Sequence, residues 1–141
     1  MLQFQLIQLG FVVFIGVFFG VEGILYFLMS ATMGFLLLET VNYIEHYGLS
    51  RERDAKGRYQ RVMPFHSWNS DHVVGRLVLF ELSRHSDHHF LANRKFQVLR
   101  HMDETPQMPT GYPGMMLMSL VPPIWFKVMN RQLDNFNKEV A

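Results

Sequence analysis

The histidines in residues 82–89 are the side chains in this chain best suited to chemistry. This segment reads Leu-Ser-Arg-His-Ser-Asp-His-His, which places His85, His88 and His89 at positions i, i+3 and i+4. On an α-helix that spacing puts all three imidazoles on one face. Neutral imidazole is a good ligand for iron, zinc, copper and nickel. The spacing therefore predicts a metal site with these three histidines as ligands, and the alternative is a structural or surface histidine run.

A fourth candidate ligand is His46, within the segment Asn-Tyr-Ile-Glu-His-Tyr-Gly at residues 42–48. At 100° per residue, Glu39, Asn42 and His46 fall within about 60° of one another on a helix. Ionisable groups near the membrane end of a helix usually face the interior of a bundle. We therefore expect His46 to join the other three, although a lone histidine at such a position is more often an interfacial anchor.

Four carboxylates are candidates to support these ligands, because a ligand histidine usually donates its second N–H to an acceptor. They are Glu39, Glu45, Glu81 and Asp87. The remaining histidines lie in a turn or in a polar stretch, so we expect them to serve capping, packing or surface roles. They are His66, His72 and His101.

The elements that must position these residues are predicted to be helical. A helix from about residue 71 to about residue 89 would carry the histidine triple at the end of an apolar stripe formed by Val74, Leu77, Val78 and Leu82. The apolar stretch 114–129 is interrupted by two prolines and is short for a membrane span. We expect it to lie at the membrane interface or to pack on the bundle.

The first part of the chain is predicted to be a transmembrane helical hairpin. Residues 4–21 and 24–38 are almost wholly apolar, and glycines with a glutamate mark a tight turn around residues 20–23. Eighteen residues span about 27 Å as a helix, close to the ~30 Å of a hydrocarbon core. A signal peptide fits poorly because no basic segment precedes the apolar run. A buried hairpin of a soluble protein is the other alternative.

Charge is distributed unevenly along the 141 residues. No Lys or Arg occurs before Arg51, and the loop 51–61 contains five basic residues: Arg51, Arg53, Lys56, Arg58 and Arg61. By the positive-inside tendency this loop is cytoplasmic, and so is the rest of the chain. We therefore predict an all-α membrane protein, with a transmembrane helical hairpin at 1–48 followed by a cytoplasmic, histidine-bearing helical segment at 49–141.

Composition excludes several other classes of protein. The chain has no cysteine, which rules out a disulfide scaffold and a thiol nucleophile. Its formal net charge of +1, with 18% charged and 49% hydrophobic residues, argues against a nucleic-acid-binding module. We expect a lipid membrane, and no nucleic acid, among its partners.

Several motifs together resemble the C-terminal portion of the membrane-bound alkane 1-monooxygenase family. They are the NYIEHYGL segment at 42–49, HSWN at 66–69, LSRHSDHH at 82–89, GYPGMM at 111–116 and LVPPIWFKVM at 120–129. The resemblance covers about residues 30–133 with the motifs in the same order. It implies an integral, multi-pass enzyme of the inner (cytoplasmic) membrane. It also implies a non-haem di-iron centre within a six-helix bundle, with the histidine motifs on the cytoplasmic side.

The implied activity is hydroxylation of the terminal methyl of n-alkanes with O2 and electrons from rubredoxin. The resemblance also makes His46, His85, His88 and His89 iron ligands. That family has two earlier histidine motifs, of the HExxHK and EHxxGHH kinds, which are not found here. We therefore expect a fragment that lacks the N-terminal half of the enzyme and is inactive by itself.

Two other functions stay open at this point. One is a related membrane hydroxylase or desaturase acting on fatty acids or other hydrocarbons. The other is a non-catalytic, histidine-rich membrane protein that binds a metal, because four histidines can close a tetrahedral site.

Overall fold

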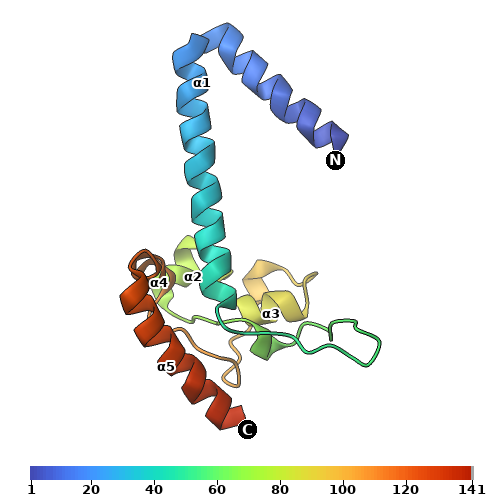
Figure 1. Ribbon diagram of the computed structural model, residues 1–141, viewed down its shortest axis with the longest axis vertical. Coiled ribbons are helices and arrows are strands. Elements are labelled where there is room, and N and C mark those ends of the chain that lie inside the picture. Colours follow the sequence, from blue (N-terminus) through green and yellow to red (C-terminus); the bar gives the residue numbers. More distant parts are fainter. Residues whose placement is uncertain (141) are drawn as a thin grey trace. The chain divides into compact units, whose positions relative to one another are not determined.

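The computed structural model describes residues 1–140, and these residues are helical or irregular, with no strand among them. The helices are α1 (Leu2–His46), α2 (Val73–Val78), α3 (His85–Phe90), α4 (Tyr112–Ser119) and α5 (Pro122–Val140), with short 3-10 turns η1 (Pro64–His66) and η2 (Phe96–Val98) (Figure 1). Isolated bridges join Arg53 to Tyr59 and Asn69 to Gln107. The prediction of an all-α protein is confirmed.

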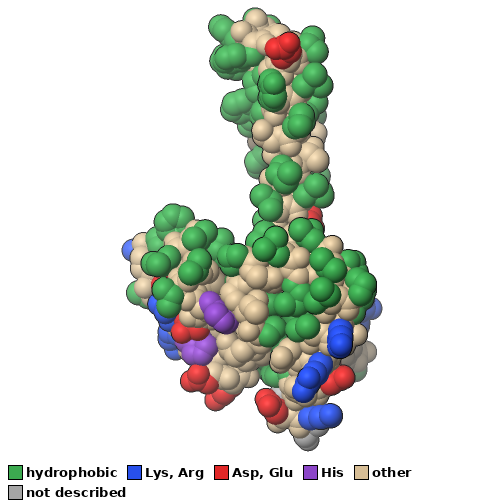
Figure 2. Space-filling model, turned by 90° about the vertical axis from the view of Figure 1, so that its left-hand side faces the viewer, with side chains coloured by type: hydrophobic (Ala, Val, Ile, Leu, Met, Phe, Trp, Pro, Cys, Tyr) green, Lys and Arg blue, Asp and Glu red, His purple; other side chains and the backbone are tan. Residues whose placement is uncertain are grey.

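The first compact unit, Met1–Glu39, consists of helix α1 up to its last turns. Gly20 interrupts this helix with φ 67° and ψ −165°, a conformation that glycine adopts at little cost, and the chain bends there (Figure 1). The bend falls at the start of the turn expected around residues 20–23. Among the described residues, α1 is the one helix long and apolar enough to cross a membrane. Its apolar side chains are exposed along its length (Figure 2).

The second compact unit, Thr40–Ala141, has its own core around the end of α1. That core combines large aromatic and aliphatic side chains from segments far apart in sequence: Ile44, Trp68, Met108, Tyr112, Met115, Trp125 and Met129. The two prolines at 122–123 begin α5 rather than interrupt a helix, as suits the missing N–H of proline. Helices α4 and α5 pack on each other.

The prediction of a single helix for residues 71–89 is wrong. The structure instead has α2 and α3, separated by a turn in which Phe80 (φ 50°) and Glu81 (φ 62°) are left-handed. The Glu81 N–H donates to the Arg76 carbonyl at 2.7 Å, which is the 6→1 bond of a Schellman-type helix end. Such ends usually have glycine at the left-handed position, and this one has phenylalanine.

The apolar stripe expected on that helix is also not a core. Val74, Leu77 and Val78 are exposed by more than half, and Leu82 is 40% exposed. Because the turn at 79–84 rotates α3 relative to α2, a stripe that would be continuous on one helix does not extend into the histidine triple.

Candidate metal centre

The last turn of α1 carries Glu45 and His46 and is held by the segment that follows η1. The Trp68 N–H donates to the Glu45 carbonyl at 2.8 Å, and the Trp68 indole N–H donates to the Tyr47 carbonyl at 2.8 Å. These bonds satisfy carbonyls that a helix C-terminus leaves without partners. Trp68 is itself 1% exposed, so the end of α1 is fixed in the core of the second unit.

The same segment positions α3. The Ser86 hydroxyl donates to the Ser67 carbonyl at 3.1 Å, and both residues are fully buried. Residues 67 and 68 therefore contact α3 on one side and the end of α1 on the other. This gives the motif His-Ser-Trp-Asn at 66–69 a structural role, which is to place His46 beside His85.

Three imidazoles come together at this junction. One ligand atom from each of His46, His85 and His89 lies within 4.8 Å of the other two. The Nε2 atoms of His46 and His85 are 3.5 Å apart, and the ring centroids of His85 and His89 are 4.3 Å apart. Two nitrogens bound tetrahedrally to one metal at ~2.1 Å are about 3.4 Å apart. The spacing of the His46 and His85 nitrogens is thus close to what one metal ion requires.

The surroundings of His85 and His89 favour the neutral form of both rings. Burial, together with the nearby His89, His46 and His88, lowers the pKa of His85 to about 2. Burial is also the main cause of a lowered pKa at His89, with contributions from His46, His88 and Arg51. Because a metal binds the neutral ring, His85 and His89 are held in the form of histidine that a metal needs.

His88 lies beside the cluster and is not among its three members. Its ring centroid is 6.0 Å from that of His85 and 5.6 Å from that of His89. The structure therefore brings together three of the four histidines singled out in the sequence, with the fourth on the same short helix.

The other three histidines have their own partners. His66 accepts from the Met63 N–H at 2.9 Å through Nδ1, while its Nε2 lies 3.1 Å from Gln60. His72 lies 3.1 Å from the Ser70 hydroxyl, and His101 lies 3.0 Å from Asp103. Within residues 1–140, none of these three belongs to the cluster of candidate ligands.

Glu45 is the carboxylate that meets the cluster. Its Oε1 lies 3.3 Å from His85 Nδ1, and its side chain is 3% exposed. This contact lacks the alignment of a hydrogen bond, and Nδ1 is a buried atom without a hydrogen-bond partner. The same Oε1 accepts a 2.6 Å hydrogen bond from Tyr112, a residue that sequence reasoning missed because it lies 67 positions away.

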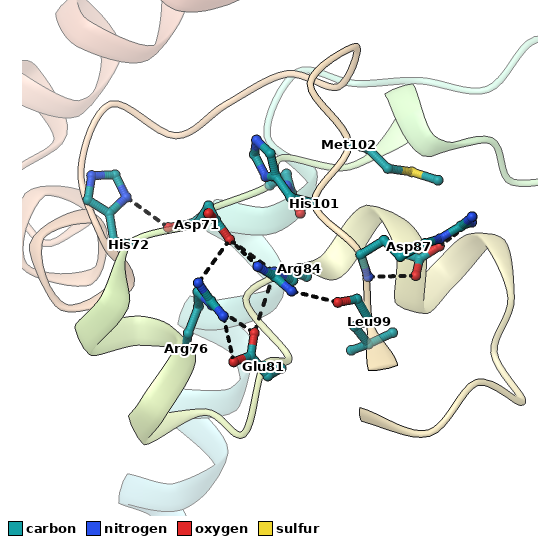
Figure 3. Close-up of polar contacts among 12 residues, drawn as sticks. Asp71, His72, Arg76, Glu81, Arg84, Asp87, Leu99, His101 and Met102 are labelled. Carbon is teal, nitrogen blue, oxygen red and sulfur yellow. Dashed lines mark hydrogen bonds and ion pairs between the residues drawn. The ribbon is translucent and has the colours of Figure 1, made fainter. Parts of the chain in front are cut away.

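Asp87 and Glu81 do not support an imidazole, contrary to expectation. Asp87 is fully buried and accepts from the Arg94 side chain and from the Arg100 N–H and side chain. Glu81 accepts from Arg76 at 2.8 and 3.0 Å and also pairs with Arg84 at 3.4 Å (Figure 3). Both acids instead form hydrogen bonds that stabilise the turns before and after α3. Glu39 lies in the first compact unit, Met1–Glu39, and its role stays a prediction.

The cluster is open to solvent on one side. A cavity of about 300 Å³ is lined by His46 and His89 together with Leu49, Arg51, Val62 and His66. A larger hollow of about 480 Å³, bounded by Met63, Phe65, Phe90 and Met102, contains none of the four histidines. Of these two cavities, the smaller one is therefore the one that borders the imidazoles of His46 and His89.

The residues present fit a metal ion of the borderline-soft kind. All three clustered donors are imidazoles, which suit iron, zinc, copper or nickel and not calcium or magnesium. The buried Nδ1 of His85 has no hydrogen-bond partner and lies 3.3 Å from Glu45 Oε1, an acceptor of the kind that orients a ligand histidine.

Comparison with known proteins gives two kinds of match. The sequence model of the fatty acid desaturase family matches residues 1–119. The alkane 1-monooxygenase 2 of Alcanivorax borkumensis is 50% identical over 121 residues, which are 86% of this chain and 32% of that protein. The alkane 1-monooxygenase 2 of Pseudomonas aeruginosa is 54% identical over 112 residues, which are 79% of this chain and 30% of that protein.

A more distant relative is the hydroxylase component of a xylene/toluene monooxygenase from Pseudomonas putida. It is 34% identical over 93 residues, covering 66% of this chain and 24% of that protein. The chain thus spans about a third of the length of the curated relatives it matches, or less.

Proposed function

Since this chain belongs to the fatty acid desaturase family, we propose that it is the part of a membrane alkane 1-monooxygenase that carries the NYIEHYG and HSDHH motifs. The observation that supports this most directly is the meeting of His46, His85 and His89 within 4.8 Å. These histidines come from two segments 39 residues apart or more, both inside the region about 50% identical to alkane 1-monooxygenases.

The metal we propose is iron, in a di-iron centre. His46, His85 and His89 would hold one ion, and His88, which projects from the same helix, would be a ligand to the second. When bound, iron supplies the redox chemistry that lets O2 attack an unactivated C–H bond. The chain's four candidate histidines are fewer than two such ions need, so we propose that further ligands come from the portion of the enzyme that carries the HExxHK and EHxxGHH motifs.

The chain's own residues would do three things in this reaction. His85 would bind the metal as a neutral imidazole, because burial keeps its pKa low. Glu45 Oε1, 3.3 Å from His85 Nδ1, would accept a hydrogen bond from the Nδ1–H group when His85 binds metal, and so leave Nε2 free as the ligand atom. The cavity beside His46 and His89 admits the small co-substrate, O2. The alkane, which offers no polar group, would bind between apolar helices.

We propose that α1 spans the inner membrane as a hairpin bent at Gly20, within a larger helical bundle. Its exposed apolar surface supports contact with lipid or with further helices. The side of the membrane that carries the histidines would be cytoplasmic, because the first basic residues of the chain follow α1 directly.

The basic loop 51–61 is proposed to steer an acidic electron donor such as rubredoxin. Arg53, Lys56 and Arg58 are exposed on it. In a full-length enzyme carrying this chain, changing all three to Gln should slow electron transfer at low salt and matter less at high salt, because salt screens exposed charges. A rate unchanged at low salt would contradict this role.

The activity is tested by a chimera. The matched third of the Alcanivorax borkumensis alkane 1-monooxygenase 2 would be replaced by this chain, and membranes containing rubredoxin, its reductase and iron would be assayed for 1-octanol from octane. We expect product from the chimera and none from its His85→Ala variant or from the chain alone. A chimera that reaches the membrane and binds iron but makes no octanol would overturn the proposal.

A further inference from the structure

We infer that Tyr112 is a positioning residue of the metal centre, which acts by fixing Glu45 and through it His85. This inference rests on the proposed function, since it assumes that His85 binds a metal. Tyr112 lies in the Gly-Tyr-Pro-Gly motif at 111–114. This motif contains none of the candidate ligands, and packing in the core does not by itself explain the hydroxyl group of its tyrosine. The structure joins this motif to the site by one hydrogen bond.

Tyr112 is placed with little freedom to move. It is the first residue of α4 and is 1% exposed, packed in the core with Ile44, Met115 and Trp125. Pro113 follows it in the first turn, where the fixed φ of proline suits a helix start. A buried tyrosine hydroxyl needs a hydrogen-bond partner. Its partner here is Glu45, at 2.6 Å.

The Tyr112 hydroxyl is a proton donor under all ordinary conditions. Burial, followed by the nearby Glu45 carboxylate and the hydrogen bond to it, raises the pKa of Tyr112 above its ordinary value. The hydroxyl therefore keeps its proton, and the Glu45 oxygen is the acceptor.

Both contacts of Glu45 use the same oxygen atom. Glu45 Oε1 accepts from Tyr112 and lies 3.3 Å from His85 Nδ1. The Glu45 side chain is 3% exposed, so water does not replace a lost partner freely. Removing the Tyr112 hydroxyl would leave this oxygen without its hydrogen-bond donor, and the carboxylate would be free to turn away from His85.

The consequence for the metal follows from the two nitrogens of one ring. His85 offers Nε2 to the cluster, 3.5 Å from His46 Nε2, only when its proton is on Nδ1. An acceptor at Nδ1 fixes that tautomer and makes the ring a better ligand. Loss of such outer partners typically costs 10- to 100-fold in metal affinity. We therefore expect Tyr112→Phe to weaken metal binding by about tenfold or more.

The test measures Co²⁺ binding to the full chain in lipid nanodiscs, by titration and by the visible absorption bands of the bound ion. Tyr112→Phe removes one hydroxyl and keeps the ring. Tyr47→Phe is the matched control, because Tyr47 also donates a 2.6 Å hydrogen bond, but to Asn130. We expect weaker binding and shifted Co²⁺ bands for Tyr112→Phe, and neither change for Tyr47→Phe.

A double-mutant cycle separates positioning from general stability. If Tyr112 acts through Glu45, then Tyr112→Phe should cause no further loss of affinity in a Glu45→Ala background. Equal losses in both backgrounds, or a Tyr112→Phe variant with parental affinity and spectrum, would overturn the inference while leaving the metal site in place. A parent chain that binds no Co²⁺ through its histidines would overturn the metal centre itself, and this inference with it.

Discussion

The replacement Asp87→Asn should destabilise the second compact unit, because this carboxylate is the anchor of α3. Asp87 lies between the candidate ligands His85 and His88 in sequence, and its side chain is fully buried. Its Oδ2 accepts from the Arg100 N–H at 2.9 Å and from the Arg94 side chain, and its Oδ1 accepts from the Arg100 side chain at 3.1 Å. These bonds join α3 to the chain on both sides of η2.

The magnitude follows from the number and exposure of these bonds. A hydrogen bond to a charged group contributes roughly 1.5–3 kcal/mol, and an exposed ion pair contributes much less. The Arg100 side chain is 56% exposed and can be rehydrated, whereas the Arg94 side chain is 20% exposed and the Arg100 N–H is a backbone donor at 2.9 Å. We therefore expect Asp87→Asn to lower the free energy of unfolding by about 2–4 kcal/mol.

The effect should depend on pH in a defined direction. Burial raises the pKa of Asp87, but the bonds from Arg100 and Arg94 outweigh it, so the net pKa lies below its usual range. A carboxylate with a lowered folded-state pKa stabilises the protein above its unfolded-state pKa of about 3.9 and loses that effect as the pH falls through the lower value. The difference between parent and variant should thus be constant from pH 7 to 5 and shrink below pH 4.

The assay is a urea titration in detergent micelles followed by tryptophan fluorescence. Both tryptophans, Trp68 and Trp125, are 1% exposed in this unit and will report its unfolding. With a slope of about 2 kcal/mol per molar urea, the midpoint should fall by about 1–2 M. Asp103→Asn is the control, because the Asp103 side chain is 94% exposed. Equal midpoints for the two variants would refute the anchoring role of Asp87.

Three further predictions concern the cluster and its surroundings. His88→Ala should keep Co²⁺ affinity within about threefold of the parent, and His46→Ala should lower it well beyond tenfold. The reason is that His46 belongs to the three-imidazole cluster and His88 does not. Equal losses of affinity for the two variants in a Co²⁺ titration would contradict this. Without metal, stability should fall as the pH drops below about 6.5, because His85 gains a proton in the unfolded chain and stays neutral where it is buried in the folded chain. The His85→Gln variant should therefore show a weaker dependence of the urea midpoint on pH. Gly48→Ala should cost about 1–2 kcal/mol in the same assay, because Gly48 has φ +71° and a Cβ there would lie 2.5 Å from Leu133; an unchanged midpoint would argue against strain.

The sequence predicted the histidine cluster better than the elements around it. The i, i+3, i+4 spacing of the triple depends on one helical turn, and α3 is just long enough to supply it. The prediction of a continuous helix from 71 to 89 was wrong because Phe80 and Glu81 adopt left-handed conformations. Glycine is the usual sequence signal of such a conformation, and neither position has one. The ion pairs of Glu81 with Arg76 and Arg84, which surround that turn, depend on a fold that helical periodicity does not describe.

The contacts that define the site are long-range, and this limits any prediction from spacing. Glu45 precedes His46 directly, yet nothing local indicates that its partner is Tyr112, 67 residues away. The same holds for Trp68, whose two bonds to the end of α1 place His46. Residue types and motif order indicated the family and the candidate ligands, whereas the side chains around those candidates are brought there by tertiary packing.

The central claim is that His46, His85 and His89 bind one metal ion together, and X-ray absorption of the Co²⁺-loaded chain tests it most directly. The account predicts a first shell of nitrogen and oxygen at about 2.1 Å with outer-shell scattering from three imidazoles, the number that the cluster supplies. This scattering should drop in His85→Ala and stay in His88→Ala. A shell with one imidazole or none, or a spectrum unchanged by His85→Ala, would contradict it.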